Sequence, residues 1–210
     1  MRRLAGPLGA CHPRLRSRPR EGRAIETQIA HRTTAELEAG LEHVRASPRG
    51  TGTVELIVAR PDVDLRVSLD LATFTIEDGL VGDNWRARGS EHTADGAANP
   101  EQQITLTNAR YLELIAGSRE RWPLAGDQLV VDLDLSDDHL AAGDRLGAGT
   151  VTFEVTAAPH TGCRKYAERY GRDAVVFANS PVGRSLHLRG IYVRVLEPGT
   201  LRVGDPISRL

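Results

Sequence analysis

The sequence predicts a mostly β, barrel-like single domain with short helices inserted between its strands. Short segments in which apolar and polar residues alternate recur along the chain, and this period of two is typical of strands that bury one face. Gly-Asp pairs at 126–127, 143–144 and 204–205 each lie beside such a segment. They are typical of turns, because glycine tolerates positive φ and aspartate bonds the turn backbone. A length of 210 residues, with 40% hydrophobic and 26% charged side chains, suits one globular domain with an extension.

The N-terminal region divides into an arm and a helix. Residues 1–30 are rich in Arg, Pro and Gly without apolar periodicity, which predicts a disordered arm. Residues 31–50 are predicted to hold an N-terminal helix, because Thr33 and Glu36 have the spacing of a capping box and apolar residues follow at helical spacing to Val44. The barrel-like domain is expected to span residues 51–210.

The elements of the domain follow from its alternating and capped segments. Strands are expected at 53–59, 65–69, 103–107, 128–135, 150–156, 188–196 and 201–203. Helices are expected at 108–116, 164–170 and 173–178, with Asn108 as the N-cap of the first and Gly171 ending the second. The polar residues 86–101 are expected to form a long exposed loop. The clearest alternation is that of segment 128–135, which therefore predicts the best-defined strand.

Composition excludes several classes of function. The first 23 residues hold seven arginines and one acidic residue, and the rest of the chain carries a net charge of −7, which is no footprint for nucleic acid. No apolar run reaches 18 residues, so no membrane span is expected. The two cysteines, Cys11 and Cys163, lie 152 residues apart; this argues against a structural disulfide and favours a reducing compartment, the cytoplasm. We also expect no pyridoxal-phosphate domain, which needs a much longer chain.

Cys163 is the most informative candidate site residue. It lies between the expected strand at 150–156 and the expected helix at 164–170. Unpaired N–H groups at a helix start, together with Arg164 and Lys165, favour its thiolate form. Such a thiolate can act as a nucleophile, a redox thiol or a soft metal ligand. The alternative is a half-buried structural cysteine.

The segments Leu124–Leu129 and Thr156–Cys163 resemble the core of the MOSC domain, the module found at the C-terminus of molybdenum cofactor sulfurases. The resemblance continues through 172–174, 179–180, 188–191 and 203–205, and Gly79–Asn84 looks like the glycine-rich turn ahead of the family's barrel strands. It covers about residues 50–208 and implies a small stand-alone member with a MOSC-like β-barrel. The chain departs from the family at its cysteine, where His160-Thr161-Gly162 stands in place of an Arg-x-Pro arrangement.

The resemblance implies a molybdenum–molybdopterin cofactor with Cys163 as the metal ligand. A bulky anionic pterin also needs cationic and amide donors, and Arg164, Lys165 and Arg189 lie inside the matching segments. Each can equally be a solvated surface charge. Asn84 is a candidate to line the site or only to shape a turn. His160 is a candidate to bond the cofactor or shuttle a proton, or a loop histidine that caps backbone.

Two activities on a small-molecule substrate follow from the resemblance: handling of sulfurated cofactor, or molybdenum-dependent reduction of N-hydroxylated compounds. Because the sequence lacks the cysteine sets of iron–sulfur modules and a dinucleotide fingerprint, either activity implies a separate electron-donor or sulfur-donor protein. The competing interpretations are a non-enzymatic binding module that has lost the cofactor, and a thiol-redox protein that uses Cys163 without metal.

Overall fold

The computed structural model describes residues 30–91 and 93–210, so all but the last residue of the predicted disordered arm lies outside the described residues. The strands are β1 (Thr51–Ala59), β2 (Val67–Leu69), β3 (Leu71–Thr75), β4 (Gly79–Leu80), β5 (Ile104–Asn108), β6 (Leu129–Asp132), β7 (Arg145–Ala148), β8 (Val151–Val155), β9 (Ile191–Glu197), β10 (Gly199–Arg202) and β11 (Pro206–Arg209). The α-helices are α1 (Thr34–Arg45), α2 (Trp85–Arg88), α3 (Ala109–Ala116), α4 (Arg164–Tyr170), α5 (Arg172–Ala178) and α6 (Pro181–Ser185). Two 3-10 helices, η1 (Pro100–Gln102) and η2 (Arg119–Ala125), complete the described elements.

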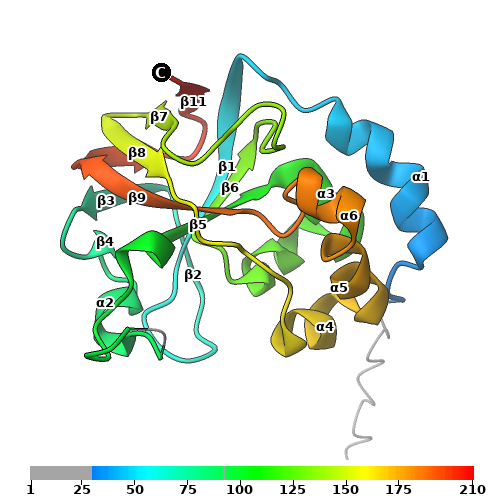
Figure 1. The fold of residues 1–210 in the computed structure, drawn as a ribbon, viewed down its shortest axis with the longest axis horizontal. Helices are drawn as coiled ribbons and strands as arrows, with labels where there is room; N and C mark the ends of the chain where they lie inside the picture. The colour runs from blue at the N-terminus through cyan, green and yellow to red at the C-terminus, as the bar shows by residue number, and fades with distance from the viewer. Residues whose placement is uncertain (1–29, 92) are drawn as a thin grey trace, which may run out of the picture.

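Seven of the described strands close into a mixed barrel in the order β1-β11-β7-β8-β9-β5-β6, with β6 returning to β1 (Figure 1). Strand β1 closes the ring because its first residues pair with β11 and its middle residues pair with β6. Its last residues, Ile57–Ala59, pair with β2, which lies outside the ring. Neighbours in the ring are antiparallel except β5 and β6, which run parallel. The prediction of a mostly β, barrel-like single domain is confirmed.

A smaller sheet of β10, β3 and β4 packs against the barrel. The barrel interior is filled by aliphatic side chains from its strands, and Phe74 of β3 meets Phe153 of β8 edge to face, with ring centroids 5.4 Å apart. The small sheet therefore extends the barrel core.

A layer of helices covers one side of the barrel, at the right of Figure 1. Buried side chains of α1, α3, α4 and α5, among them Leu37, Tyr111 and Tyr170, form a second apolar cluster. Strand β6 contributes to both clusters, because Val131 points into the barrel and Val130 lies under the helices. The alternation of apolar and polar residues, which is typical of strands that bury one face, therefore did not predict the burial of Val130 on the second face.

The local predictions based on capping are confirmed. Thr33 and Glu36 form the capping box of α1, the Asn108 side chain accepts a hydrogen bond from the Tyr111 N–H at the start of α3, and α4 ends at Gly171. Boundaries were less well predicted: β6 ends at Asp132 and β9 begins at Ile191. The unbroken loop expected at 86–101 was wrong at its ends, which form parts of α2 and η1.

Candidate functional site

Cys163 lies at the point where the chain leaves β8 and enters α4. It is the N-cap residue of α4 in an extended conformation, its side chain makes no capping hydrogen bond, and it is a free, exposed thiol. The preceding residue is fixed from α5: the Gly162 N–H donates to Asn179 Oδ1 over 3.1 Å, and Asn179 Nδ2 donates to the Gly162 carbonyl over 3.4 Å. The thiol is thus held in place by its backbone and left free for chemistry.

A cavity of about 230 Å³ adjoins the thiol, and we call it the Cys163 cavity. It is formed by the loop between β1 and β2, the turn before α2, the end of η2 and the start of α4. In Figure 1 this loop leaves the barrel on the side that carries α2 and α4. Of the candidates from the sequence, the cavity brings together Asn84, Cys163, Lys165 and Arg189.

The Cys163 cavity is strongly cationic. We call its positively charged lining the cationic wall: Arg60, Arg66, Arg88, Lys165, Arg169 and Arg189. The carboxylates that line the same cavity are Asp62 and Asp64. Arg60 also binds Asp83 at 2.8 Å and Arg189 binds Asp127 at 2.8 Å, so two of the six cations have carboxylate partners outside the cavity lining. The six positive charges still outnumber these four carboxylates, which favours an anionic ligand.

Several polar atoms of the lining have no partner. The Nε atoms of Arg66 and Arg189 and the Oδ1 atom of Asn84 are buried and without a hydrogen bond within residues 30–91 and 93–210. Burial, and then repulsion from Arg169 and Arg60, lowers the pKa of the Arg66 guanidinium. Burial and the charge of Arg60 likewise lower the pKa of Arg88. A bound anion would relieve both effects.

Arg189 is the buried member of the cationic wall. Its Nη1 donates to both carboxylate oxygens of Asp127, each over 2.8 Å, and its guanidinium carbon lies 4.7 Å from the ring centroid of Tyr166. Burial alone would lower the pKa of Arg189, but the charge of Asp127, the nearby Tyr166 and the hydrogen bonds to Asp127 together raise the pKa. The Asp127 carboxylate therefore keeps the Arg189 guanidinium protonated and fixed in position.

His160 lies behind the Cys163 cavity. It lines a different cavity, the His160 cavity of about 310 Å³, together with His187. Its ring is buried, with Nε2 4.0 Å from Asp127 Oδ1 and its centroid 4.5 Å from that of Tyr192. Burial, followed by the charges of Arg189 and Arg60, lowers the pKa of His160 well below its ordinary value. His160 is therefore connected to the Cys163 cavity only indirectly: Asp127 lies beside His160 and binds Arg189, which lines the cavity.

Arg164 stands apart from the other candidates. Its side chain is 88% exposed and faces Glu168, one turn along α4, at 3.5 Å. It is not among the residues that line the Cys163 cavity. Its position is that of a solvated surface charge.

Sequence reasoning missed Arg60, Arg66, Arg169 and Asp127. The spacing of Arg169 four residues after Lys165 was a usable signal, because it puts both side chains on one face of a helix. Asp127 was interpreted only as a turn marker, yet it is buried and binds Arg189. No local pattern identifies Arg60 and Arg66, which the β1–β2 loop brings to the site from far along the chain.

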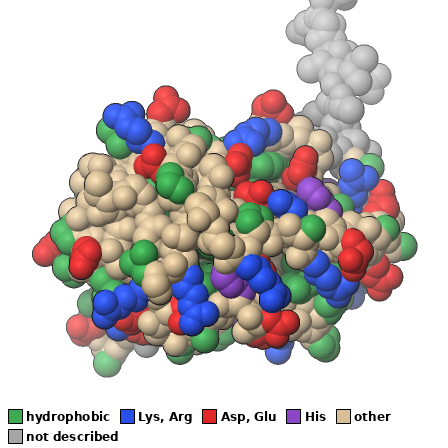
Figure 2. Space-filling view, turned by 90° about the horizontal axis from the view of Figure 1, so that it is seen from above, with side chains coloured by type: hydrophobic (Ala, Val, Ile, Leu, Met, Phe, Trp, Pro, Cys, Tyr) green, Lys and Arg blue, Asp and Glu red, His purple; other side chains and the backbone are tan. Residues whose placement is uncertain are grey.

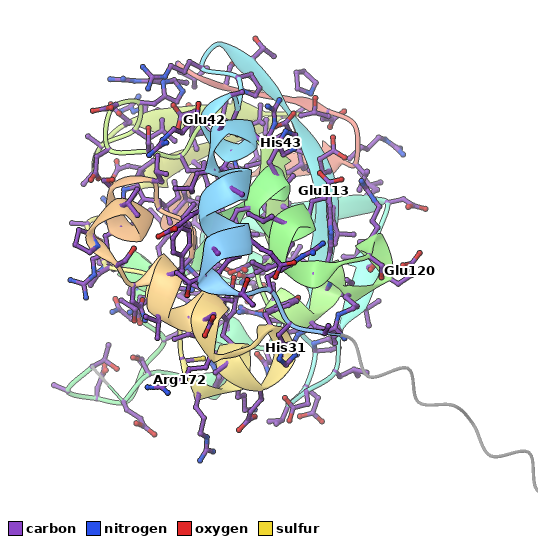
Figure 3. The ribbon with its side chains drawn as sticks, turned by 90° about the vertical axis from the view of Figure 1, so that its right-hand side faces the viewer. His31, Glu42, His43, Glu113, Glu120 and Arg172 are labelled. Carbon is purple, nitrogen blue, oxygen red and sulfur yellow. The ribbon has the colours of Figure 1, made fainter. Side chains whose placement is uncertain are left out.

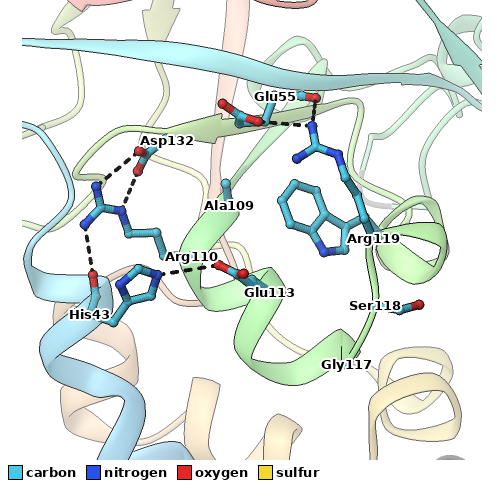
Figure 4. A pocket seen from close by; sticks show the side chains of 10 residues that line it. His43, Glu55, Ala109, Arg110, Glu113, Gly117, Ser118, Arg119 and Asp132 are labelled. Atoms are coloured by element: carbon cyan, nitrogen blue, oxygen red, sulfur yellow. Dashed lines mark hydrogen bonds and ion pairs between the residues drawn. The ribbon is translucent and has the colours of Figure 1, made fainter.

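A larger cavity of about 410 Å³ lies on the helical side of the barrel, and we call it the His43 cavity (Figure 4). Arg110 binds Asp132 through two hydrogen bonds of 2.7 and 3.1 Å, and Arg119 binds Glu55 at 3.0 Å. His43 Nε2 lies 3.5 Å from Glu113. In Figure 3 these two residues project from neighbouring helices. Charges in this cavity are paired.

Within the described residues, no group of three or more His, Cys, Asp or Glu side chains could hold a metal ion. None of the described helices is both long enough and apolar enough to cross a bilayer.

The sequence matches the family model of the MOSC domain over residues 82–208. The barrel, the exposed cysteine at the start of α4 and this match together define the class, and the chain belongs to the MOSC domain family. Asn84, Cys163 and Arg189 fall within the matched residues, whereas Arg60, Asp64 and Arg66 precede them.

Solved structures share the fold. The YuaD protein from Bacillus subtilis superposes with a TM-score of 0.52 at 18% identity, covering 75% of this chain and 94% of that one. YiiM from Geobacillus stearothermophilus gives a TM-score of 0.50 at 19% identity, covering 76% and 75%. Among proteins with curated descriptions, none matches the sequence.

Proposed function

We propose that the Cys163 cavity binds a molybdenum–pterin cofactor, with the Cys163 thiolate as the metal's protein ligand. The observation that carries this proposal is the combination, in a MOSC-family chain, of a free exposed thiol with a cationic wall. A thiolate suits the soft molybdenum–dithiolene unit, and guanidinium groups suit the anionic parts of a pterin.

The donor set supports the fit. The unpartnered Nε atoms of Arg66 and Arg189 can donate to ligand oxygens, and the unpartnered Asn84 Oδ1 can accept from a pterin N–H. The Cys163 cavity is smaller than the roughly 300–1,000 Å³ of typical ligand pockets. A second cavity of about 310 Å³ shares Arg88 with it and is lined by Trp85, Ser90 and Gln102.

In this proposal each residue of the site has a separate role. Cys163 supplies the soft sulfur, while Lys165 and Arg189 bind negative charge. Asp127 keeps the Arg189 guanidinium oriented and charged. His160, whose neutral form burial favours, can hold or pass a proton at Nε2 beside Asp127 without occupying the cavity. Arg164 makes no direct contribution, because its side chain projects into solvent.

Two activities fit such a site. When bound, the cofactor would supply either an exchangeable sulfur or a two-electron redox centre. Reduction of an N-hydroxylated compound to the amine and water consumes two electrons and two protons, so it requires a separate electron-donor protein. Handling of sulfurated cofactor instead requires a sulfur-donor protein. Both suit a reducing compartment such as the cytoplasm, where Cys163 stays a free thiol.

Metal analysis tests the proposal directly. Protein purified from cells that make molybdopterin should contain molybdenum and extractable pterin in near-equal amounts. A molybdenum enzyme produced in the same cells serves as the loading control. Metal-free protein from cells in which that control is loaded would contradict the proposal.

The exposure of Cys163 also supports a second candidate, a thiol-redox protein without metal. That interpretation predicts no molybdenum and fast alkylation of Cys163 near neutral pH. A binding module that has lost the cofactor predicts no molybdenum and slow alkylation. One purified sample therefore separates the three.

A further inference from the structure

Asp64 joins two walls of the Cys163 cavity. It lies on the loop between β1 and β2, and its Oδ1 atom is 3.0 Å from Lys165 Nζ and 3.1 Å from Arg169 Nη2, both on α4. The Asp64 backbone has a φ of 58°, a left-handed conformation that is unusual for a residue other than glycine. The chain thus accepts an uncommon local geometry that presents this carboxylate to α4.

We call residues 61–65 the strap. Its tip is weakly packed, since Val63 is 72% and Leu65 50% exposed. Its own hydrogen bonds are local: the Val63 N–H donates to Asp62 Oδ1 and the Leu65 N–H to the Asp62 carbonyl. The ion pairs of Asp64 therefore form the strap's link to α4 among the described contacts.

Three cations converge where Asp64 binds. A Cβ atom placed on Gly126 would lie 3.2 Å from Arg66 Nη2 and 3.8 Å from Arg169 Nη1, so these two guanidinium groups approach one point from opposite elements. Lys165 shares Asp64 with Arg169, and Arg66 Nε is buried without a partner in the described part of the chain. One carboxylate thus faces three positive charges.

We propose that Arg66, Lys165 and Arg169 form a subsite for a doubly charged oxyanion of the phosphate type, and that Asp64 occupies this subsite until the ligand's anionic group displaces it. The strap is then released from α4 and opens the Cys163 cavity. The inference rests on the proposed function insofar as it treats this cavity as a ligand site. It adds a selectivity device, carried by a loop that precedes the family match.

The exchange is physically reasonable. Both ion pairs of Asp64 are solvent-exposed, and exposed pairs contribute little to stability. A phosphate group brings a second negative charge and more acceptor oxygens, so it can satisfy Arg66 as well as the two residues of α4. A singly charged ion gains no such advantage over the resident carboxylate. The subsite therefore discriminates by charge.

Isothermal titration of cofactor-free protein with inorganic phosphate tests the inference. Asp64→Asn removes the competing charge, and we expect it to bind phosphate about three- to tenfold more tightly than wild type. Asp62→Asn is the matched control, because Asp62 lines the same cavity but its carboxylate bonds the backbone of the strap. We expect its affinity to change less than about twofold. Equal effects of the two substitutions, or no effect of Asp64→Asn, would overturn the inference.

Hydrogen exchange of residues 61–65 gives a second readout. Phosphate should accelerate exchange of the strap in wild type, whereas Asp64→Asn should exchange fast without phosphate. An unchanged strap would overturn the inference even if phosphate binds. These measurements need no molybdenum. They therefore still test the phosphate subsite if the protein proves to be metal-free.

The same titration with cofactor-loaded protein distinguishes two sources of the anionic group. If loading abolishes phosphate binding, the cofactor itself supplies the group. If phosphate still binds, the subsite belongs to a phosphorylated substrate. Both results support the subsite.

Discussion

The His43 cavity and the Cys163 cavity differ in how their charged side chains are partnered. The His43 cavity is the larger, at about 410 Å³ against 230 Å³. Its arginines bind carboxylates. In the cationic wall beside Cys163, Arg60 and Arg189 also bind carboxylates, but Arg66 and Arg189 keep buried Nε donors without partners in residues 30–91 and 93–210. Unbalanced charge beside a reactive side chain marks the candidate site better than volume does.

The difference follows from what each cavity joins. The ion pairs of the His43 cavity connect α3 and η2 to β6 and β1, so they tie the helical layer to the barrel. Arg119 also lies over the ring of Trp122, 4.5 Å from its centroid. The face seen in Figure 2 has the same balanced character, with charged side chains of both signs close together. At the Cys163 cavity, by contrast, a loop and a helix bring like charges together.

The largest expected effect concerns the thiol itself. Cys163→Ser should keep the fold, because the two side chains are nearly isosteric, and should lower bound molybdenum to background, because serine lacks the soft and readily ionised sulfur. Molybdenum content and the melting temperature of the same samples measure both parts. Cys11→Ser is the internal control and should change neither. Full molybdenum content in Cys163→Ser would remove this residue from the proposed site.

The two cavities can also be compared by how much free energy of unfolding is lost when the carboxylate of one ion pair is removed. Asp127→Asn should destabilise the protein by about 3 kcal/mol, because it leaves the buried Arg189 charge uncompensated. Asp132→Asn in the His43 cavity should cost at most about 1 kcal/mol, since Asp132 and Arg110 are 30% and 22% exposed. Urea unfolding of both variants measures the difference. Equal costs would show that Arg189 finds another partner when Asp127 is lost.

The sequence predicted most of the fold where local rules decide it. The capping box of α1 and the ends of α3 and α4 follow from side chains within a few residues of one another. The strands β3, β4, β7 and β11 were not predicted: all are short, and β3, β7 and β11 also pair with strands far along the chain. Burial of Val130 was missed for a related reason: only the tertiary fold places a helical layer over β6.

The site was predictable only in part. Cys163 was found because its segment has a local pattern and a family resemblance. The pairing of Asp127 with Arg189 spans 62 residues, and that of Asp64 with Lys165 spans 101. Neither pairing produces a periodic pattern in the sequence. The sequence alone therefore could not distinguish these charged residues from ordinary surface charges.

The stabilisation that bound phosphate provides should also differ between variants of the two cavities, although this effect is smaller. At a phosphate concentration ten times the wild-type Kd, binding should add about 1.4 kcal/mol to the free energy of unfolding. Arg169→Gln, in the cationic wall, should lose most of this increment. Arg119→Gln, in the His43 cavity, should retain it, because its parent side chain is engaged by Glu55. Denaturation with and without phosphate cancels the intrinsic cost of each substitution. Loss of the increment in both variants would show that phosphate does not distinguish the cavities.

The smallest expected effect is a pH dependence that separates His160 from His43. Burial lowers the pKa of His160 in the folded protein well below its ordinary value, whereas the unfolded chain binds this proton near pH 6.5. The unfolded state therefore binds more protons as the pH falls below about 6.5, and stability decreases in that direction. One such histidine removes about 0.8 kcal/mol at pH 6.0 relative to pH 8. His160→Gln should abolish this loss, and His43→Gln should preserve it, because it leaves the buried His160 imidazole in place. The measurement is the free energy of unfolding of the three proteins at the two pH values. A loss that persists in His160→Gln would show that another group, and not His160, causes the pH dependence.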